Sequence, residues 1–345
     1  MKSPFTGGKA VLVREPRSLQ FRGELFDIVY HLWRCEDTGK PFTTDELDRL
    51  NITQVHNQYR EKHRVPFPEE IREIRSKYGV SATKMSAVMG FGVNTWRNYE
   101  QEEIPQTSNA RLIRLAADPE EFTKLVNLSS DLFREKERAK LEKQIKALWE
   151  QEAHDPSKSL TVLLSDRSFW PNRFNGYRAL KPEKLFHLIC YFAREHRLYK
   201  TRLNKLLFYT DFLHYKLTGF SITGIVYRAI DLGPVPDRFD VLYEFGVNEN
   251  YYHIDYELQT SGKNSDQDNL GERFIPNEDK VFDIDLFNDS ELGVVKRISE
   301  LFKFKKTKDI IDISHREKLW LELHEGRALI QYDRAFELEL DVELH

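Results

Sequence analysis

The sequence LNKLLFYTDFLHYKL, residues 203–217, predicts a buried helix at the centre of the C-terminal part of this chain. Its apolar residues recur at helical spacing and form one wide stripe: Leu203, Leu206, Leu207, Phe208, Leu213 and Leu217. Lys205, Asp211 and His214 are polar residues on the same helix. A helix with so wide an apolar stripe packs against other helices, and we expect a mainly α fold with small β elements.

The composition indicates a globular chain with more than one domain. It has 345 residues, of which 40% are hydrophobic and 31% are charged, which is enough for two or three cores. The net charge of −4 excludes a uniformly basic nucleic-acid coat but not one DNA-reading face. The two cysteines, Cys35 and Cys190, exclude a disulfide-built secreted scaffold. Without a signal-like segment or a long apolar run, we expect a cytoplasmic protein with no membrane partner.

Residues 1–66 are predicted to form a small β-containing domain. Alternating apolar residues at 23–33 are typical of a strand. A polar helix is expected at 44–64, with Thr43 or Thr44 as its cap. Prolines 66 and 68 then interrupt the chain.

Residues 67–127 are predicted to form five short helices. The first helix is expected from Pro68 to a stop at Gly79, and the second from the cap Ser81 to the turn at Gly90. The third is expected over Val93–Glu100, the fourth from the cap Thr107 or Ser108 to Ala117, and the fifth begins at Asp118. Two short helices joined by a tight glycine turn indicate a helix-turn-helix, in which the helix at 93–100 would read the major groove.

The predicted recognition helix carries the candidate DNA contacts. Asn94 and Asn98 lie four residues apart, on one face, and asparagine can pair with adenine in the major groove. Thr95 and Arg97 lie beside them, and Lys84 of the preceding helix completes the set. The alternative is a helical bundle with exposed asparagines. Seven basic and seven acidic residues lie between 68 and 118, so counterion release helps little and we expect a homodimer.

Residues 128–152 are predicted to form a charged linker helix. Leu141, Ile145 and Leu148 indicate either one docking stripe on a solvated helix or a short dimeric coiled coil. A linker is expected at 154–159.

The remaining chain, 153–345, is predicted to be mostly helical. Helices are expected at 182–195, 201–217, 291–302 and 316–324. Residues 219–230 alternate like a strand, Gly233-Pro234-Val235-Pro236 is expected to form a rigid loop, and 261–272 a mobile surface loop.

Two N-terminal motifs resemble parts of MqsA/HigA-type antitoxins. MKSPFT at 1–6 with RCEDT at 34–38 resembles their zinc knuckle, and GVN at 92–94 with RNYE at 97–100 resembles their XRE-type helix-turn-helix. In that family two Cys-x-x-Cys pairs hold the metal, and the matching positions here are Ser3, Thr6, Cys35 and Thr38. One thiolate and three hydroxyls make a poor structural zinc site, so we expect no metal and no cofactor, with packing holding this domain together.

A second resemblance covers about residues 175–330. LNKLLFYTDF at 203–212, His214, Gly219, ITG at 222–224, Tyr227 and GPVP at 233–236 are similar in order and spacing to the SocA-like, or Panacea, domain. The resemblance implies a chiefly helical domain that neutralises a toxin; the family also includes a protease adaptor.

The polar residues of the central helix allow two interpretations. Lys205, Asp211 and His214 form either a partner-binding patch or an internal network that holds the loop at 233–236. Tyr251, Tyr252 and the aromatic region 302–304 are candidate contacts for a protein partner. We expect no enzyme, because no HExxH motif, phosphate-binding glycine loop or nucleophile elbow is present and Cys190 lies in an apolar segment.

Taken with these resemblances, the sequence predicts a type II antitoxin. Residues 153–345 would bind a cognate toxin, and residues 67–127 would bind a double-stranded operator as a dimer and repress the operon. The alternative is a stand-alone transcription regulator or a protease adaptor that works with a Clp-type protease.

Overall fold

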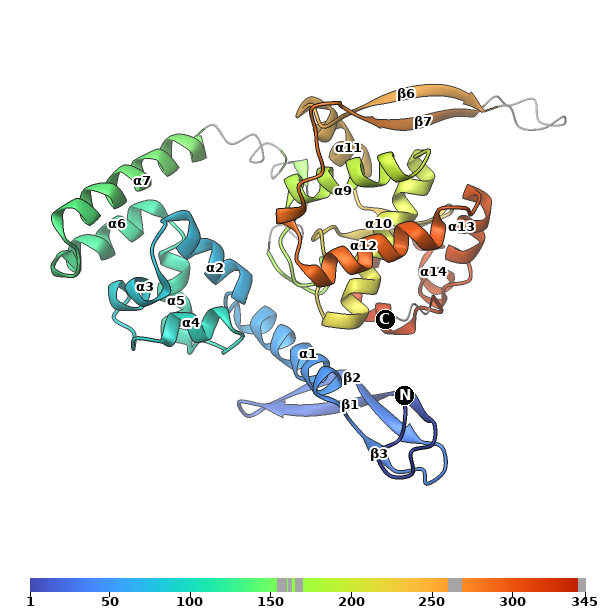
Figure 1. Ribbon diagram of the computed structural model, residues 1–345, viewed down its shortest axis with the longest axis horizontal. Helices are drawn as coiled ribbons and strands as arrows, with labels where there is room; N and C mark the ends of the chain where they lie inside the picture. The colour runs from blue at the N-terminus through green and yellow to red at the C-terminus, as the bar shows by residue number, and fades with distance from the viewer. Residues whose placement is uncertain (154–159, 161–162, 165–169, 260–268, 341–345) are drawn as a thin grey trace. The chain divides into compact units, whose positions relative to one another are not determined.

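The computed structural model describes residues 1–153, 160, 163–164, 170–259 and 269–340 (Figure 1). They fall into two compact units, Met1–Gln54 with Ser159–His345 and Val55–Lys158. The described residues are mainly helical, with small antiparallel sheets, which confirms the predicted fold class. The linker expected at 154–159 lies outside them.

The N-terminal segment forms a long two-stranded ribbon. β1 (Ala10–Phe21) pairs with β2 (Glu24–Cys35) along its whole length, and β3 (Pro41–Phe42) adds a short third strand. The connecting turn places Arg22 and Gly23 at φ values of 48° and 84°, the backbone of a tight hairpin. The alternation at 23–33 correctly predicted β2, whereas β1 was not located because charged residues and Pro16 interrupt its pattern.

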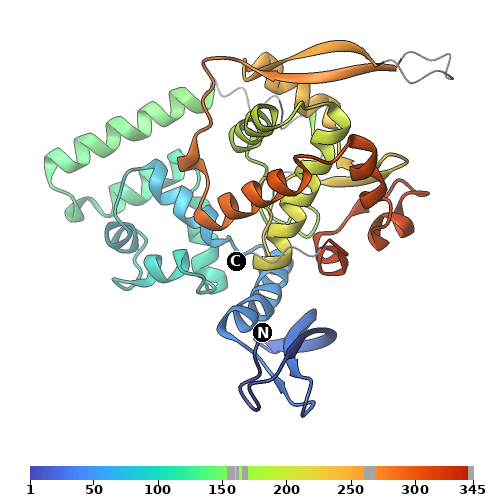
Figure 2. The ribbon, with the colours of Figure 1, turned by 45° about the vertical axis from the view of Figure 1, so that its right-hand side comes forward.

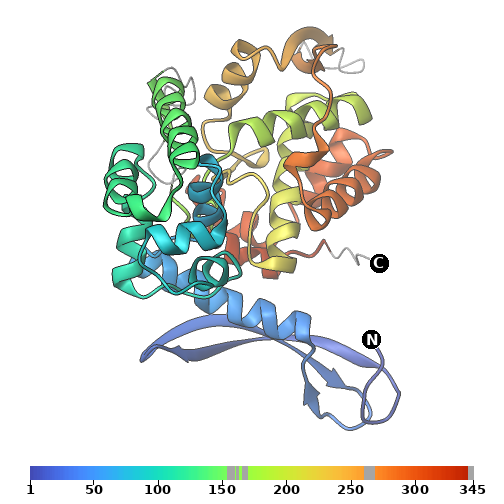
Figure 3. The same ribbon diagram turned by 60° about the vertical axis from the view of Figure 1, so that its left-hand side comes forward.

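Helix α1 (Asp45–His63) runs along this ribbon (Figure 3). The Asn51 side chain accepts a hydrogen bond from the His31 amide at 2.8 Å and donates one to its carbonyl at 2.9 Å. Gln54 makes the same pair of bonds to Val29, at 3.1 and 2.9 Å. These two amide side chains satisfy an open edge of β2 as a further strand would.

The five predicted short helices are present in the second unit. They are α2 (Pro68–Lys77), α3 (Ala82–Val88), α4 (Thr95–Glu100), α5 (Thr107–Leu115) and α6 (Pro119–Leu128). Ser81 and Asp118 cap α3 and α6, as predicted. The cap predicted for α5 is wrong, because Thr107 is already its first residue and Gln106 precedes it without a side-chain bond.

The charged segment at 128–152 does not form the one continuous helix that the sequence predicted. A short 3₁₀ turn at Ser130–Leu132 separates α6 from α7 (Glu135–Ala153). Leu141 and Ile145 of α7 are buried in the same core as Trp96 and Phe122, and Leu148 packs against it. The stripe therefore docks within the chain, which confirms the first of the two interpretations.

The C-terminal part of the first unit, here called the C-terminal unit, is built around α10 (Lys200–Thr218), which lies among the other helices (Figures 1 and 2). Every residue from Leu203 to Lys216 is buried. The helix contacts α9 (Pro182–Glu195), α12 (Asp289–Phe302) and α13 (Thr307–Ser314), as well as strands β5 (Gly233–Pro236) and β7 (Asn269–Pro276). Burial on all sides is typical of a central helix. Thr201, the predicted cap, lies inside α10, whose cap residue is Tyr199.

Two β elements in this unit differ from the prediction. Only Tyr227–Ile230 (β4) of the expected strand at 219–230 pairs, because Gly219 ends α10 at φ 78° and the Ile222 and Thr223 amides bond to the Asp211 side chain. Gly233–Pro236 is not a loop but strand β5, paired with β4 at the edge of a sheet completed by β8 (Leu329–Ile330). An edge strand tolerates the two prolines, whose missing N–H groups face no partner.

Several further elements complete the unit. They are α11 (Phe239–Asn248), the hairpin of β6 (Tyr252–Gln259) and β7 (Asn269–Pro276), α14 (Lys318–Leu323), and 3₁₀ turns at Ile284–Leu286 and Tyr332–Glu337. Helix α13 was not predicted. The loop expected at 261–272 is in part strand β7, since its last residues pair with β6, and residues 260–268 lie outside the described part of the chain.

Candidate functional site

The face of α4 gathers most of the predicted DNA contacts. Trp96 and Tyr99 are buried and fix the helix, while Arg97 and Asn98 are exposed, as is Asn94, which stands at the N-cap position without a side-chain capping bond. The Ser86 hydroxyl of α3 accepts a hydrogen bond from the Trp96 amide at 3.0 Å. Glu100 accepts bonds from the Trp96 indole and the Arg75 guanidinium, so its charge is directed inward.

Lys84 and Thr95 lie apart from that exposed set. The Lys84 ammonium donates to the Leu132 carbonyl at 2.7 Å, lies 3.5 Å from Glu137 and stands 4.8 Å over the Phe133 ring. It therefore ties α3 to the start of α7. Thr95 is half-buried at the first turn of α4. Their assignment to DNA binding stays a prediction.

The four predicted knuckle positions meet in the structure. The Thr6 hydroxyl lies 3.6 Å from Cys35 Sγ, and hydroxyls of Ser3 and Thr38 also bond to this sulfur. Hydrogen bonds from Ser3 and then Thr38 lower the pKa of the Cys35 thiol to about 6, although burial acts in the opposite direction.

Backbone amides complete these two turns. The amides of Phe5, Gly8 and Lys40 donate to the hydroxyl oxygens of Ser3, Thr6 and Thr38 at 3.2, 3.1 and 3.4 Å. Among the described residues no cluster of three or more His, Cys, Asp or Glu side chains is placed to hold a metal ion. The donor set here, one thiol and three hydroxyls, does not fit structural zinc.

Asp211 organises the segment that follows α10. It is fully buried and accepts bonds from the amides of Ile222 and Thr223, each at 2.8 Å, and from the hydroxyls of Thr223 at 2.5 Å and Tyr227 at 2.8 Å. Burial raises the pKa of this carboxyl, and the four bonds oppose the rise. This arrangement is typical of a structural carboxylate, because every bond is internal to the domain.

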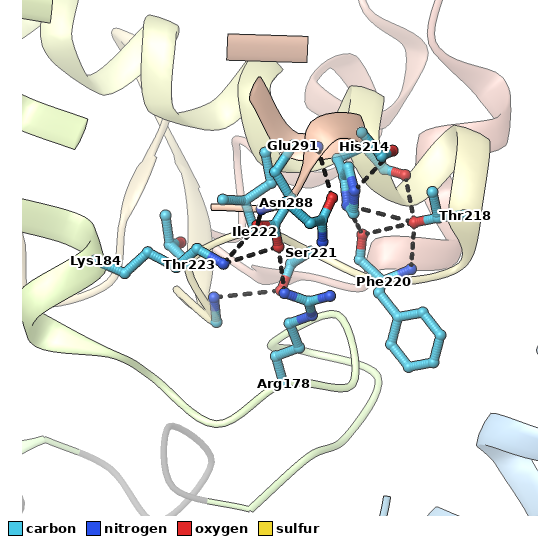
Figure 4. A network of polar contacts seen from close by, with 12 residues as sticks. Arg178, Lys184, His214, Thr218, Phe220, Ser221, Ile222, Thr223, Asn288 and Glu291 are labelled. Atoms are coloured by element: carbon cyan, nitrogen blue, oxygen red, sulfur yellow. Dashed lines mark hydrogen bonds and ion pairs between the residues drawn. The ribbon is translucent and has the colours of Figure 1, made fainter. Parts of the chain in front are cut away.

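His214 belongs to a second buried network, drawn in Figure 4. Its Nδ1 faces the Phe220 carbonyl at 2.7 Å and therefore donates, and burial lowers its pKa to about 4. Glu291 at the start of α12 lies 2.7 Å from the Lys184 ammonium and also pairs with Arg178. Burial would raise the pKa of Glu291, but the Arg178 and Lys184 charges outweigh it and the net shift is downward.

Lys205, the remaining candidate residue on α10, is also buried. Its ammonium donates to the Pro234 carbonyl at 3.0 Å, which ties α10 to β5. Burial lowers its pKa to about 7. The close packing explains Gly233, since a Cβ there would lie 2.5 Å from Lys205 Nζ. Lys205, Asp211 and His214 thus hold different neighbours and do not form one exposed patch.

The aromatic candidates are divided by burial. Tyr252 is almost fully buried, and its ring packs 5.3 Å from that of Phe274. Tyr251 is half-buried against Phe186 and His187. A partner docking on the folded surface would not reach Tyr252, Lys205, Asp211 or His214 directly, and their role in partner binding stays a prediction. In the 302–304 region, Phe302 is buried and Phe304 is exposed.

Cys190 has the surroundings of a structural thiol. It donates to the Tyr251 carbonyl at 3.4 Å, and burial raises its pKa to about 11. A thiol with so high a pKa is a poor nucleophile at neutral pH.

The C-terminal unit is a helical domain around the buried helix α10, whose Asp211 carboxylate is fully hydrogen-bonded within the domain. Comparison with known families gave a match in this unit. Residues 203–321 match the family described as antitoxin SocA-like, Panacea domain. The matched segment begins in α10 and ends in α14, and it includes Asp211, His214 and Glu291. No curated protein and no solved structure matches the chain. Among the helices of the described residues, none has both the length and the apolar character needed to cross a membrane.

Proposed function

We propose that this chain is the antitoxin of a type II toxin–antitoxin system. Its C-terminal domain neutralises a cognate toxin by direct binding, and its helix-turn-helix represses its own operon. The observation that carries the proposal is the antitoxin SocA-like match at 203–321. An exposed polar helix face on a separate compact unit supports the second activity.

The exposed face of α4 supports DNA recognition. Asn94 and Asn98 can each pair with a base edge in the major groove, and Arg97 can bind guanine or phosphate. Among the residues that the structure describes, no carboxylate pairs with Arg97, so its charge is available to a ligand. Buried Trp96 and Tyr99 keep the helix in place, so binding needs little reordering.

Homodimer formation is part of the proposal because basic and acidic residues balance over residues 68–118. Arg75 pairs with Glu100 at 2.6 Å and Arg114 with Glu70 at 3.6 Å. With basic and acidic residues balanced, one copy would contact few phosphates. Two copies on a two-fold operator would double those contacts, as in other helix-turn-helix dimers.

Neutralisation is tested by co-expression with the product of the adjacent reading frame. We expect that product alone to arrest growth, and the full-length chain to restore growth and co-purify with it. An Arg97→Ala/Asn98→Ala variant should neutralise as well as wild type, because these residues lie outside the matched domain. If the adjacent product is harmless alone, or if the chain co-purifies only with a Clp-type unfoldase, the antitoxin proposal is wrong.

Operator binding is tested by fluorescence anisotropy with a duplex from upstream of the coding sequence. Arg97→Ala or Asn98→Ala should weaken binding about tenfold or more, the usual effect of losing one base contact. Lys143→Ala is the matched control, since this exposed cation lies on α7, at the opposite end of the unit from α4 (Figure 1). Equal losses in all three variants, or equal affinity for a scrambled duplex, would contradict specific recognition.

A further inference from the structure

The Phe304 side chain, in the turn between α12 and α13, is exposed to solvent. Phe304 is 94% exposed, whereas Phe302, two residues earlier, is fully buried and packs 5.4 Å from the Tyr209 ring. Single exposed apolar residues are common on protein surfaces and carry no function by themselves. The surroundings of Phe304 distinguish it.

Those surroundings are strongly basic in a chain whose net charge is −4. Residues 296–308 contain six basic residues and one acidic residue. Four of the lysines fall within residues 303–308, the turn after α12 together with the first two residues of α13, here called the Phe304 loop. Lys303 pairs with Glu195 at 3.1 Å. In the described part of the chain, Lys306 and Lys308 are exposed and no carboxylate forms an ion pair with them. The loop therefore offers uncompensated positive charge around one aromatic ring.

The Phe304 loop is held in one conformation by hydrogen bonds to neighbouring residues. The Arg202 guanidinium of α10 donates to the carbonyls of Phe302 and Lys305, on either side of Phe304. The Lys305 amide bonds back to the Phe302 carbonyl at 3.2 Å, and the Lys306 amide donates to Asp309 at 3.0 Å as α13 begins. A ring presented by a fixed loop loses little conformational entropy when a partner covers it.

We propose that the Phe304 loop docks an acidic surface of the protein that this chain neutralises, with Phe304 in an apolar pocket of that protein. The inference rests on the proposed antitoxin function and names the chemistry of the partner. Exposed lysines around a central aromatic residue match a partner with carboxylates around an apolar pocket, the usual arrangement of an interface centre and its rim. Nucleic acid is disfavoured because single-strand binding surfaces present several aromatic rings for successive bases.

The experiment compares variants of the full-length chain in binding to the purified product of the adjacent reading frame. Phe304→Ala should weaken binding about 30-fold or more, as expected for an aromatic residue at an interface centre. Lys305→Glu/Lys306→Glu/Lys308→Glu should slow association about tenfold or more at low salt and remove most of its salt dependence. Leu258→Ala is the matched control, because this side chain is 68% exposed in the same unit, and it should bind as wild type does.

The outcomes separate this inference from the proposed function. If wild type neutralises and binds the product but both loop variants bind within about threefold of it, the loop is not the docking surface and the antitoxin proposal survives. If wild type does not bind the product, both fail together. If Phe304→Ala leaves toxin binding intact but weakens binding to bulk tRNA, the loop binds nucleic acid and the inference is wrong. Unchanged thermal midpoints of the variants exclude misfolding as the cause of any loss.

Discussion

Substituting three residues should convert the N-terminal turns into a metal site. The perturbation is Ser3→Cys/Thr6→Cys/Thr38→Cys, which adds three thiols around Cys35. A zinc–thiolate bond of about 2.3 Å places tetrahedral sulfurs about 3.8 Å apart. Thr6 Oγ1 and Cys35 Sγ are already 3.6 Å apart, and the Ser3 and Thr38 hydroxyls contact the same sulfur. Little backbone movement is therefore needed to admit the ion.

Hydrogen bonds from backbone amides should stabilise the negative charge of the four-thiolate site. The amides of Phe5, Gly8 and Lys40 point at the three hydroxyl oxygens and would donate to thiolates in the same positions. Structural zinc typically binds with an apparent free energy of about 10–16 kcal/mol. At a free zinc concentration 100-fold above Kd, binding should add about 2.7 kcal/mol to the stability of this segment.

The assay is metal stoichiometry by mass spectrometry, with thermal unfolding with and without zinc under reducing conditions. We expect one equivalent of zinc in the triple variant, a higher midpoint with metal, and the absorption spectrum of a tetrahedral cobalt thiolate after cobalt substitution. The control adds Cys35→Ala to the triple variant, which leaves three thiols and should bind more weakly. A triple variant that folds but takes up no metal, or binds cobalt octahedrally, would refute the reasoning from geometry.

Three further predictions concern stability. Glu291→Gln should cost about 3–5 kcal/mol in urea unfolding, since it removes the charge of a buried carboxylate that pairs with both Lys184 and Arg178. The pKa of Glu291 is lower in the folded state than in the unfolded state. The difference in free energy of unfolding between wild type and Glu291→Gln should therefore be full above the ordinary carboxyl pKa and vanish as pH falls through the folded-state pKa. A difference that does not change with pH would contradict this. Lys205 has a folded pKa of about 7, below its unfolded value, so wild-type stability should rise between about pH 7 and 10, by up to about 1.4 kcal/mol per pH unit. Lys205→Met should lack that rise in unfolding curves taken across this range. Leu141→Ala should destabilise the second unit by about 2–5 kcal/mol, whereas the exposed neighbour Lys143→Ala should change little; equal effects would show that α7 does not dock there.

Most helices were predicted correctly from the sequence, because the interactions that begin and end a helix join residues close together in the chain. Ser81 and Asp118 cap α3 and α6 through bonds to amides two or three residues away. The apolar spacing of Leu141 and Ile145 indicated a docking face correctly. Where local signals compete, they misled: Thr107 and Thr201 resemble caps, yet each lies inside its helix. The extended residue that precedes the helix comes earlier, at Gln106 for α5 and at Tyr199 for α10.

The sites depend more on contacts between distant residues. A family resemblance showed from the sequence that Ser3 with Thr6 and Cys35 with Thr38 stand three residues apart. The sequence did not predict the hydrogen bonds that join these two turns. Asp211 was recognised as a polar residue on an apolar helix, while its partners at 222–227 come from a segment that alternates like a strand. The Ile222 and Thr223 amides bond to this buried carboxylate instead of a neighbouring strand, because an unpaired charge in the core would cost more than the lost strand hydrogen bonds.

The sequence by itself determined the mainly helical class, the central position of the helix at 203–217, and the polar face of the helix at 93–100. Tertiary structure alone decided which side chains a partner can reach. Phe302 and Phe304 share one local pattern, F-x-F among lysines, yet the first is buried and the second exposed. Arg202, a hundred residues earlier in the chain, holds the carbonyls on both sides of Phe304. Exposure is thus set by long-range packing, which periodicity within one segment does not encode.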